Sequence, residues 1–309
     1  MGRRGGSPVR SGSRWIGAWS VRRWAIVLML GAITSCGSQD AMEPVIDDDD
    51  TTPPGFEPGN PPPESGANFH LMFDGVDDRV LVPWNASFPT EVFTIAAQVR
   101  LATPGSRAAI IARGEDDNSF NLSWQMYVGR TGSLEVMLEA SNEDNYCYPN
   151  NDCVPQGVCE SDDMFVADGM WHHVAITRDV SGTLVFYVDG AERARCTGTG
   201  TPSSNNRKSL SIGSTHGQIG PLPPGGVEPP IWFFPGEIEN PAMWSRSLSA
   251  ADVLAVHEAG VDIGSADLKG YWSLNEGEGQ TVFDRSPAAN HGYRGGQPAA
   301  DSADPTWVN

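Results

Sequence analysis

The sequence of 309 residues is poor in several residue types, and each shortage excludes a class of protein. It has 20 Lys and Arg against 39 Asp and Glu, which gives a formal charge of −19. Such a negative surface would repel nucleic acids and anionic lipids, so neither is expected as a partner. No apolar run reaches the roughly 20 residues that a permanent membrane-spanning helix needs. The sequence also contains no internal repeat.

Catalytic motifs are missing as well. There is no G-x-S-x-G, no H-E-x-x-H and no P-loop. His172 and His173 are adjacent, so on a strand they point to opposite faces and cannot bind one ion as neighbours. His216, His257 and His291 are isolated in the sequence. These absences argue against an enzyme.

Residues 1–35 are expected to be a targeting segment rather than part of a fold. They contain six Arg and no acidic residue, with an apolar run at 24–33. The run leads into Ile33-Thr34-Ser35-Cys36, which resembles the lipobox of bacterial lipoproteins. That resemblance implies a lipid on Cys36 and a place in the cell envelope, at the outer membrane or cell surface. Two alternatives stay open: secretion with a free Cys36 thiol, and a twin-arginine signal at Arg22-Arg23, whose spacing is wrong.

Residues 36–68 are expected to form a disordered tether. The segment contains four consecutive aspartates at 47–50 and three prolines at 61–63, with almost no large apolar residue. Such a composition cannot bury enough surface to offset the entropy of ordering. Its prolines and like charges favour an extended spacer. The aspartate run is a calcium site in the competing interpretation.

The most legible fold signal is the stretch from Trp171 to Gly190, WHHVAITRDVSGTLVFYVDG. Two β-rich runs alternate with period two on either side of the turn at 179–182, which predicts an antiparallel hairpin. Asp189-Gly190 predicts the next turn. Further strands are expected at 108–111, 123–128 and 133–140. The last of these alternates Leu134, Val136 and Leu138 with polar positions, which predicts a solvent-exposed face.

One helix is expected after residue 248. Ser249 can cap it with Asp252 as its capping-box partner, and Gly260 fits the position after its end. The C-terminal segment around Pro305–Val308 has the pattern of an outer strand that completes the jellyroll, and a truncated second domain is the alternative. Together these signals predict an all-β, two-sheet antiparallel sandwich with one short helix over residues 69–309.

Six short motifs, in order along the chain, resemble those of laminin-G-like jellyrolls in the concanavalin A-like lectin/glucanase superfamily. They are the segments FDGVDDRV at 73–80, FTIAAQV at 93–99, the hairpin WHHVAIT to YVDG, LSIG at 210–213, FPGEIE at 234–239 and WSRSLS at 244–249. The resemblance covers the chain from Phe69 onward. Gln98 stands where the family has Trp.

Residues 141–165 interrupt the strand pattern with a cysteine-rich insertion. Four cysteines lie beyond the lipobox: Cys147, Cys153, Cys159 and Cys196. An even number in an exported chain predicts two disulfides, with three connectivities possible. We expect one within the insertion and one from it to Cys196. A zinc site is the competing interpretation, but the spacing matches no common zinc motif. The insertion either shapes a binding site or only stabilises the domain.

The resemblance also implies a structural Ca²⁺, because such jellyrolls often hold one through loop oxygens. By motif, the candidate ligands are Asp74, Asp77, Asp78, Glu239 and Asp284. Glu239 replaces the family's Asp, and its carboxylate is one methylene farther out. In the competing interpretation Asp74 and Asp77 only stabilise their turn through local hydrogen bonds.

The predicted function is that of a surface-tethered, non-catalytic module that binds a carbohydrate or a protein. Trp124, Tyr127 and Trp232 are candidate stacking platforms for sugars, or core residues of the sandwich. The alternative is a hydrolase or lyase with an atypical carboxylate site. Retaining glucanases on this fold use E-x-D-x-x-E. Here Glu237-Ile238-Glu239 is followed by Pro241, which would interrupt a central strand, and by Ala242 in place of the third acid.

Overall fold

The computed structural model describes a single unit of the chain. The described residues are 56, 58–62, 67–102, 105–113, 115–116, 124–138, 164–196, 202, 209–217 and 230–309. All of them belong to the compact unit Asp47–Asn309. The predicted signal peptide, with Cys36, lies outside them. Cys147, Cys153 and Cys159 lie outside them as well, so the pairing of the cysteines with one another and with Cys196 remains a prediction.

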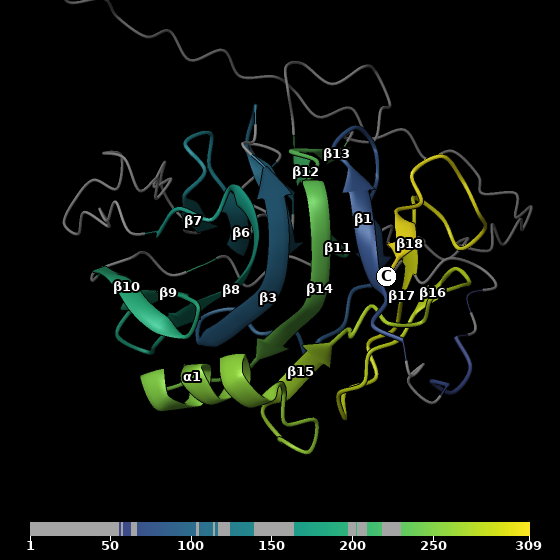
Figure 1. The fold of residues 1–309 in the computed structure, drawn as a ribbon. Helices are drawn as coiled ribbons and strands as arrows, with labels where there is room; N and C mark the ends of the chain where they lie inside the picture. Colours follow the sequence, from purple (N-terminus) through teal and green to yellow (C-terminus); the bar gives the residue numbers. More distant parts are fainter. Residues whose placement is uncertain are drawn as a thin grey trace, which may run out of the picture. The chain divides into compact units, whose positions relative to one another are not determined.

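Two antiparallel sheets form the domain, as predicted (Figure 1). Sheet A has the order β10-β9-β8-β3-β14-β1-β18, with β15 also paired to β14. Its strands are β10 (Ala191–Cys196), β9 (Leu184–Val188), β8 (Asp168–Arg178), β3 (Phe93–Ala102), β14 (Pro235–Trp244), β1 (His70–Asp74), β18 (Thr306–Val308) and β15 (Leu268–Tyr271).

Sheet B has the order β16-β17-β2-β11-β4-β6-β7. Its strands are β16 (Thr281–Val282), β17 (Gly292–Arg294), β2 (Val80–Val82), β11 (Leu210–Ile212), β4 (Ala108–Arg113), β6 (Trp124–Val128) and β7 (Leu134–Leu138). A small third sheet joins β13 (Pro230–Ile231), β12 (Thr215–Gly217) and β5 (Glu115–Asp116).

The core lies between the inner faces of sheets A and B. Val174 and Ile176 of β8 belong to it, as the alternation predicts, together with Ile110 and Met126 of sheet B. Each fully buried side chain of this size contributes about 1.5–3 kcal/mol. The period-two pattern therefore fixes which face of each strand points inward.

The predicted hairpin is confirmed. β8 and β9 pair from Val174 opposite Val188 to Arg178 opposite Leu184. The turn between them is held by Asp179, whose Oδ1 accepts hydrogen bonds from the backbone N–H groups of Ser181 and Thr183 at 2.8 and 3.0 Å. Asp189 and Gly190 both have positive φ, which is the geometry of a two-residue hairpin turn.

The solvent-exposed face predicted for residues 133–140 is wrong. In β7, Met137 is fully buried and Glu135 is nearly so. Met137 packs with Ala109 and Tyr127 on the outer face of sheet B, beside the half-buried Trp232. This face of β7 is therefore buried, and the polar residue Glu135 at an alternating position did not indicate a solvent-exposed face.

Pro241 does not interrupt its strand, contrary to expectation. β14 runs through it and pairs with β3 on both sides, with an irregular register between Glu239 and Ala242. Asn240 has a φ of 55° at this point. Proline is tolerated within sheets at such bulges. The predicted C-terminal strand is confirmed as β18, which pairs with β1 at the edge of sheet A.

The predicted helix is confirmed as α1 (Ala250–Ala259). Ser249 is its N-cap, the capping box with Asp252 is complete, and Gly260 follows it with a φ of 84°. Among the described residues no helix is long and apolar enough to span a membrane. Two described residues of the predicted tether contact the domain: Phe56 packs edge to face on Tyr293, and the Pro62 carbonyl accepts a hydrogen bond from Arg285.

Candidate ligand-binding site

The outer face of sheet A is divided between two kinds of side chain. At one end small residues, Ala96, Ala175 and Ala242, form a cluster with Val253 of α1. Small side chains let the helix approach the sheet closely. At the other end the same strands carry large polar and aromatic side chains, and α1 does not reach them.

Strand register places these larger residues in one row across five strands. Trp171 of β8 is opposite Arg100 of β3, and Arg100 is opposite Glu237 of β14. Glu237 is opposite Met72 of β1, which in turn is opposite Thr306 of β18. Residues directly opposite each other share a face. The row spans about 19 Å, since neighbouring strands lie about 4.8 Å apart.

Four side chains of this surface converge, and we call them the Trp171 cluster: Trp171, Arg100, Glu237 and His70. Glu237 Oε2 accepts hydrogen bonds from Arg100 and from His70 Nε2, the latter at 2.7 Å. The guanidinium of Arg100 lies over the indole of Trp171, 5.2 Å from its centroid. Met72 next to the cluster is 42% exposed, and the Arg100 side chain is 40% exposed. The cluster is thus ordered by its own contacts and still open to solvent.

Glu239 lies two residues after Glu237 on β14 and therefore on the same face. It pairs with Gln98 of β3 and is half-buried. Burial raises the pKa of Glu239 above its ordinary value, while the charge of His70 and a hydrogen bond from Asn240 oppose the rise. Two carboxylates, Glu237 and Glu239, accordingly share this surface.

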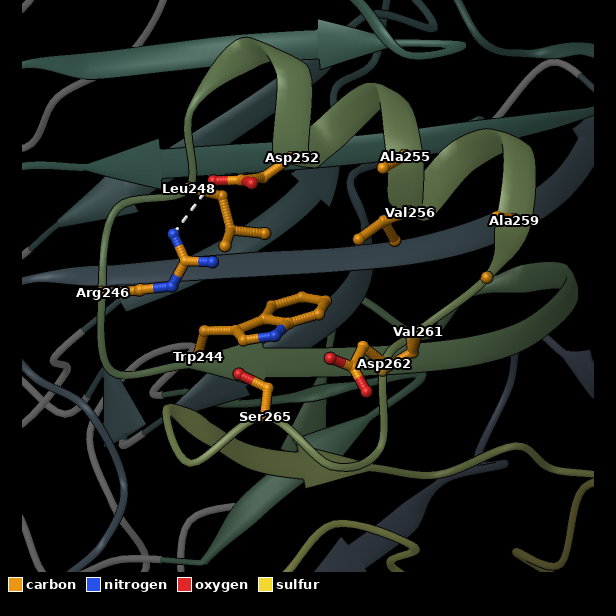
Figure 2. Close-up of a pocket in the computed structure, with 11 residues that line it drawn as sticks. Trp244, Arg246, Leu248, Asp252, Ala255, Val256, Ala259, Val261, Asp262 and Ser265 are labelled. Carbon is orange, nitrogen blue, oxygen red and sulfur yellow. Dashed lines mark hydrogen bonds and ion pairs between the residues drawn. The ribbon is translucent and has the colours of Figure 1, made fainter.

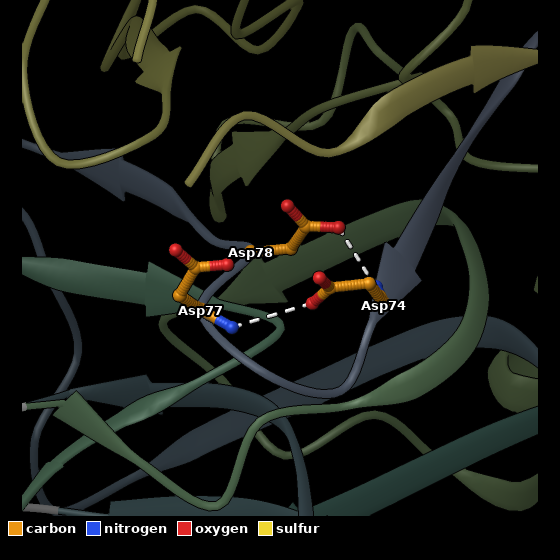
Figure 3. A group of neighbouring side chains, drawn as sticks. All are labelled: Asp74, Asp77 and Asp78. Carbon is orange, nitrogen blue, oxygen red and sulfur yellow. Dashed lines mark hydrogen bonds between the residues drawn. The ribbon is translucent and has the colours of Figure 1, made fainter. Parts of the chain in front are cut away.

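The acidic turn, Asp74, Asp77 and Asp78, joins β1 to β2 (Figure 3). One carboxylate oxygen from each residue lies within 4.8 Å of the others. Asp74 Oδ1 accepts hydrogen bonds from the N–H groups of Val76 and Asp77, at 2.7 and 3.3 Å. Asp78 Oδ2 accepts one from the N–H of Asp74 at 2.7 Å. Asp74 thus makes the turn hydrogen bonds of the competing interpretation, and the turn also gathers three carboxylates.

Burial raises the pKa of Asp78 from its ordinary value to about 6, and the negative charges of Asp74, Asp77 and Asp304 add to the rise. The hydrogen bond from the Asp74 N–H opposes it. A carboxylate in such surroundings gains stability from any nearby cation.

The other two predicted metal ligands lie elsewhere. Within the described residues the acidic turn is the one group of three such side chains, and it includes neither Glu239 nor Asp284. Asp284 is 1% exposed and accepts four hydrogen bonds: from the N–H groups of Tyr271, Ser286 and Asn290 and from the Ser286 hydroxyl. Its oxygens are therefore engaged in organising a loop, and Asp284 does not lie in the group formed by Asp74, Asp77 and Asp78.

The three candidate stacking residues, Trp124, Tyr127 and Trp232, lie in different parts of the sandwich. Trp124 is fully buried in the core between the sheets, and its indole N–H donates to the Pro89 carbonyl at 2.9 Å, so the core interpretation holds for it. Tyr127 is also fully buried. The structure brings Tyr127 and Trp232 together on the outer face of sheet B, with ring centres 5.3 Å apart and Arg107 over the half-buried Trp232.

A cavity of about 360 Å³ lies between α1, the end of β14 and the loop after the helix (Figure 2). Trp244 forms its floor, and small residues of the helix, Ala255 and Ala259, line its side. Trp244 is 3% exposed, so it offers little surface to a ligand. The cavity is a gap left by small side chains and is not our candidate site.

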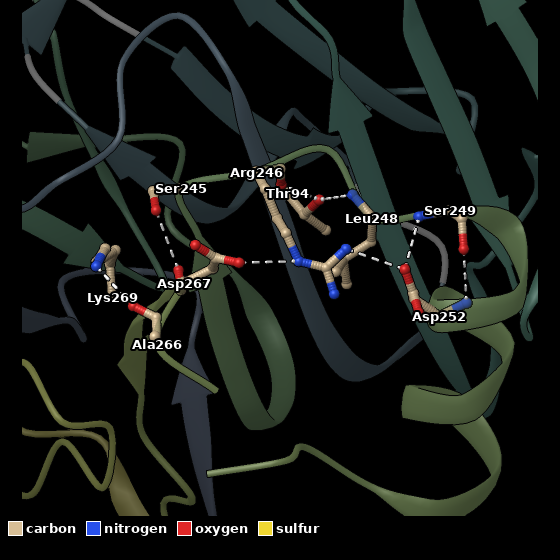
Figure 4. A network of polar contacts seen from close by, with 9 residues as sticks. All are labelled: Thr94, Ser245, Arg246, Leu248, Ser249, Asp252, Ala266, Asp267 and Lys269. Carbon is tan, nitrogen blue, oxygen red and sulfur yellow. Dashed lines mark hydrogen bonds and ion pairs between the residues drawn. The ribbon is translucent and has the colours of Figure 1, made fainter. Parts of the chain in front are cut away.

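Polar contacts beside this cavity fix α1 on sheet A (Figure 4). Arg246 bridges Asp252 and Asp267, at 3.0 and 3.3 Å. Thr94 Oγ1 donates to the Arg246 carbonyl and accepts from the Leu248 N–H, each at 2.8 Å. These bonds join the start of the helix to β3 and explain why the helix covers only one end of the face.

Sequence reasoning missed the Trp171 cluster. Alternation within β3, β8 and β14 places Arg100, Trp171 and Glu237 on outward positions, which the sequence could have indicated. Their alignment in one row depends on the register between strands distant in the chain, and no local pattern specifies that.

The two antiparallel sheets with helix α1 form a concanavalin A-like jellyroll sandwich. The sequence from residue 74 to 254 matches the model of the Laminin_G_3 family, described as the concanavalin A-like lectin/glucanases superfamily. The chain belongs to this superfamily. A search of the curated proteins finds no match.

Several solved structures are similar to this chain. A candidate carbohydrate binding protein from Bacteroides ovatus ATCC 8483 superposes with a TM-score of 0.52 at 18% identity, over 79% of this chain and 62% of that protein. The CBM40 of the Ruminococcus gnavus IT-sialidase, solved with α2,6 sialyllactose, gives 0.43 at 15% identity, over 62% and 97%. A pentraxin from Limulus polyphemus gives 0.40 at 16%, over 65% and 84%. The chain thus spans less than two thirds of the first of these, and at such identities the likeness concerns the fold.

Proposed function

We propose that the domain is a non-catalytic carbohydrate-binding module whose ligand lies over the Trp171 cluster on the outer face of sheet A. The observation that carries this proposal is the convergence of Trp171, Arg100, Glu237 and His70 on an open sheet face. A sugar has an apolar ring face and a rim of hydroxyls. An aromatic ring beside fixed donors and acceptors matches both parts.

The polar groups of the cluster are held ready for such a ligand. Both bonds to Glu237 go to Oε2, and no bond to Oε1 occurs among the described residues. Oε1 is therefore available to accept from a sugar hydroxyl, and the exposed guanidinium of Arg100 can donate to another. Because Arg100 is fixed by Glu237 and Trp171, less side-chain entropy is lost on binding.

Sheet B offers a weaker site. Among the described residues of its outer face, Tyr127, Met137 and Glu135 are buried, whereas Trp232 and Arg107 are partly accessible. The fold that this chain shares with the candidate carbohydrate binding protein of Bacteroides ovatus is compatible with a sugar ligand, and it does not decide between the two faces.

We further propose that the acidic turn holds a structural Ca²⁺. Ca²⁺ takes six to eight oxygens. Asp74, Asp77 and Asp78 can each offer one carboxylate oxygen, backbone carbonyls and water supplying the rest. The turn is tied to the C-terminal segment, since Ser302 Oγ donates to Asp77 at 3.2 Å and the Arg79 N–H donates to the Ala303 carbonyl at 3.1 Å. A cation there would stabilise the junction of β1, β2 and that segment.

The N-terminal sequence supports a further proposal, that the module lies at the cell envelope. A lipid on Cys36 and the acidic, proline-rich segment after it would hold the domain at the outer side of a bacterial membrane, where extracellular glycans are accessible.

A carbohydrate hydrolase is the second candidate function, and the pair Glu237 and Glu239 favours it. Both carboxylates face the same surface, and burial raises the pKa of Glu239, as in a general acid. Ala242 stands where the retaining glucanases have their second catalytic carboxylate. Glu237 already accepts hydrogen bonds from His70 and Arg100. We therefore prefer binding without catalysis.

The test is a glycan-array screen of the full chain, first in Ca²⁺ and then in EDTA. The proposal expects specific binding to a glycan that remains intact after prolonged incubation. Silence on every glycan would overturn it and direct attention to a protein ligand. Release of reducing ends from the bound glycan, abolished by Glu239→Gln, would establish the hydrolase instead.

A further inference from the structure

Two neighbouring histidines of β8 have opposite surroundings. His172 is satisfied: its Nδ1 pairs with Asp189 at 2.9 Å and its Nε2 with Asp168 at 3.2 Å. His173 is 6% exposed, and neither ring nitrogen has a hydrogen-bond partner. A buried polar group without a partner is rare, and an unseen water or ion is a common reason for one.

The ring of His173 faces another histidine from a distant part of the chain. His257 of α1 lies with its ring centre 5.4 Å from that of His173, at an interplanar angle of 41°. His257 is exposed on the helix surface. It lies close to the turn between β9 and β10, since a Cβ atom built on Gly190 would be 3.3 Å from the Cβ atom of His257. The pair thus combines a buried imidazole with one that solvent can reach.

The separation of the rings fits a shared metal ion. Two imidazoles that bind one ion through nitrogens about 2.0–2.1 Å away, at a tetrahedral angle, have ring centres roughly 5 Å apart. Imidazole is a preferred ligand of Cu²⁺, Ni²⁺ and Zn²⁺, whereas Ca²⁺ prefers oxygen. The carboxylate of Asp189 also attracts positive charge to this place.

We propose that His173 and His257 form a two-histidine site for a divalent transition-metal ion, which links α1 to β8 of sheet A. Water completes the coordination on the exposed side of His257. Burial, together with the neighbouring His257, lowers the pKa of His173 to about 4, so the ring is neutral at neutral pH and one of its two nitrogens has a lone pair for a metal ion. The site shares no residue with the acidic turn or with the Trp171 cluster.

The first measurement is pulsed EPR of the untagged full chain with one equivalent of Cu²⁺. The expected spectrum shows two equatorial imidazole nitrogens on one copper ion. His257→Ala is expected to remove at least one of them and to weaken Cu²⁺ binding at least tenfold. Because His257 is exposed, this variant should fold normally. Leu254→Ala, one turn earlier on the same helix, is the matched control and should bind like the parent chain.

A second measurement separates this site from others. Zn²⁺ should raise the melting temperature of the parent chain and of Asp74→Asn, but not that of His257→Ala. Equal metal affinity in His257→Ala and the parent chain would overturn the proposal, and a bound water would then be the partner of His173. Loss of binding in Asp74→Asn alone would overturn it too and assign the metal to the acidic turn.

Discussion

His70 and Trp171 meet edge to face with ring centres 5.2 Å apart, although β3 and β14 separate their strands. Three strand spacings amount to about 14 Å between the two backbones. The two side chains therefore lean toward each other above Arg100 and Glu237. This convergence distinguishes the Trp171 cluster from a row of independently solvated residues and makes it the place to test for ligand binding.

Replacing Trp171 by Ala should lower affinity for the array-identified glycan at least tenfold. The change removes the aromatic ring and also the surface on which Arg100 rests. Isothermal titration calorimetry measures the effect. Trp232→Ala is the matched control, because it removes an indole that also lies under an arginine, on the other sheet. If Trp232→Ala abolished binding and Trp171→Ala did not, the site would lie on sheet B.

Replacing Glu237 by Gln should weaken glycan binding about tenfold with little effect on folding. The amide keeps the shape of the side chain but loses the charge that fixes Arg100 and His70. Binding titrations at several salt concentrations should show that the salt dependence of glycan affinity changes when the charge of Glu237 is removed. Glu258→Gln on the exposed face of α1 is the control and should leave affinity unchanged. An unaltered affinity in Glu237→Gln would show that the ligand does not contact the cluster.

Most of the fold could be predicted from sequence because its signals are local. Alternation in Val174 to Thr177 fixes the faces of β8, Asp189-Gly190 encodes a tight turn, and Ser249 with Asp252 encodes the start of α1. The errors have physical causes. The buried face of β7 depends on what packs over sheet B, and Pro241 is accommodated by a bulge that local sequence does not announce.

The candidate sites were harder to predict because they depend on register and on packing between distant segments. Asp74, Asp77 and Asp78 are near in sequence, so their proximity could be expected. Arg100, Trp171 and Glu237 come together only through the order of strands in sheet A. His173 and His257 meet because α1 folds onto the hairpin end, 84 residues away in the chain.

Asp78 should make stability depend on pH in the direction opposite to an ordinary salt-bridged aspartate. Its pKa is about 6 in the folded state and 3.8 without the fold. The folded state therefore holds the proton more tightly, and the free energy of unfolding should fall as pH rises from about 4 to about 6. Denaturant unfolding at several pH values measures this: the free energy of unfolding of the parent chain, relative to that of Asp78→Asn, should fall between about pH 4 and about pH 6. Ca²⁺ should remove the difference if it binds the acidic turn; an identical pH course in both proteins would contradict the raised pKa.

Replacing Asp284 by Asn should destabilise the domain by about 2–4 kcal/mol, because the new NH₂ group would face donors that now meet a carboxylate oxygen. The backbone N–H of Asn290, 2.6 Å from Oδ2, cannot reverse its role. Asp262→Asn is the matched control: this residue is exposed and accepts one bond, from Gly264, so little loss is expected. The measurement is denaturant unfolding in Ca²⁺ and in EDTA. Since four hydrogen bonds within the loop engage the Asp284 carboxylate, the destabilisation by Asp284→Asn should be the same in both, whereas Asp74→Asn should be more costly in Ca²⁺. A loss in Asp284→Asn that appeared only in Ca²⁺ would return this residue to the ligand set and contradict the structural role assigned to it here.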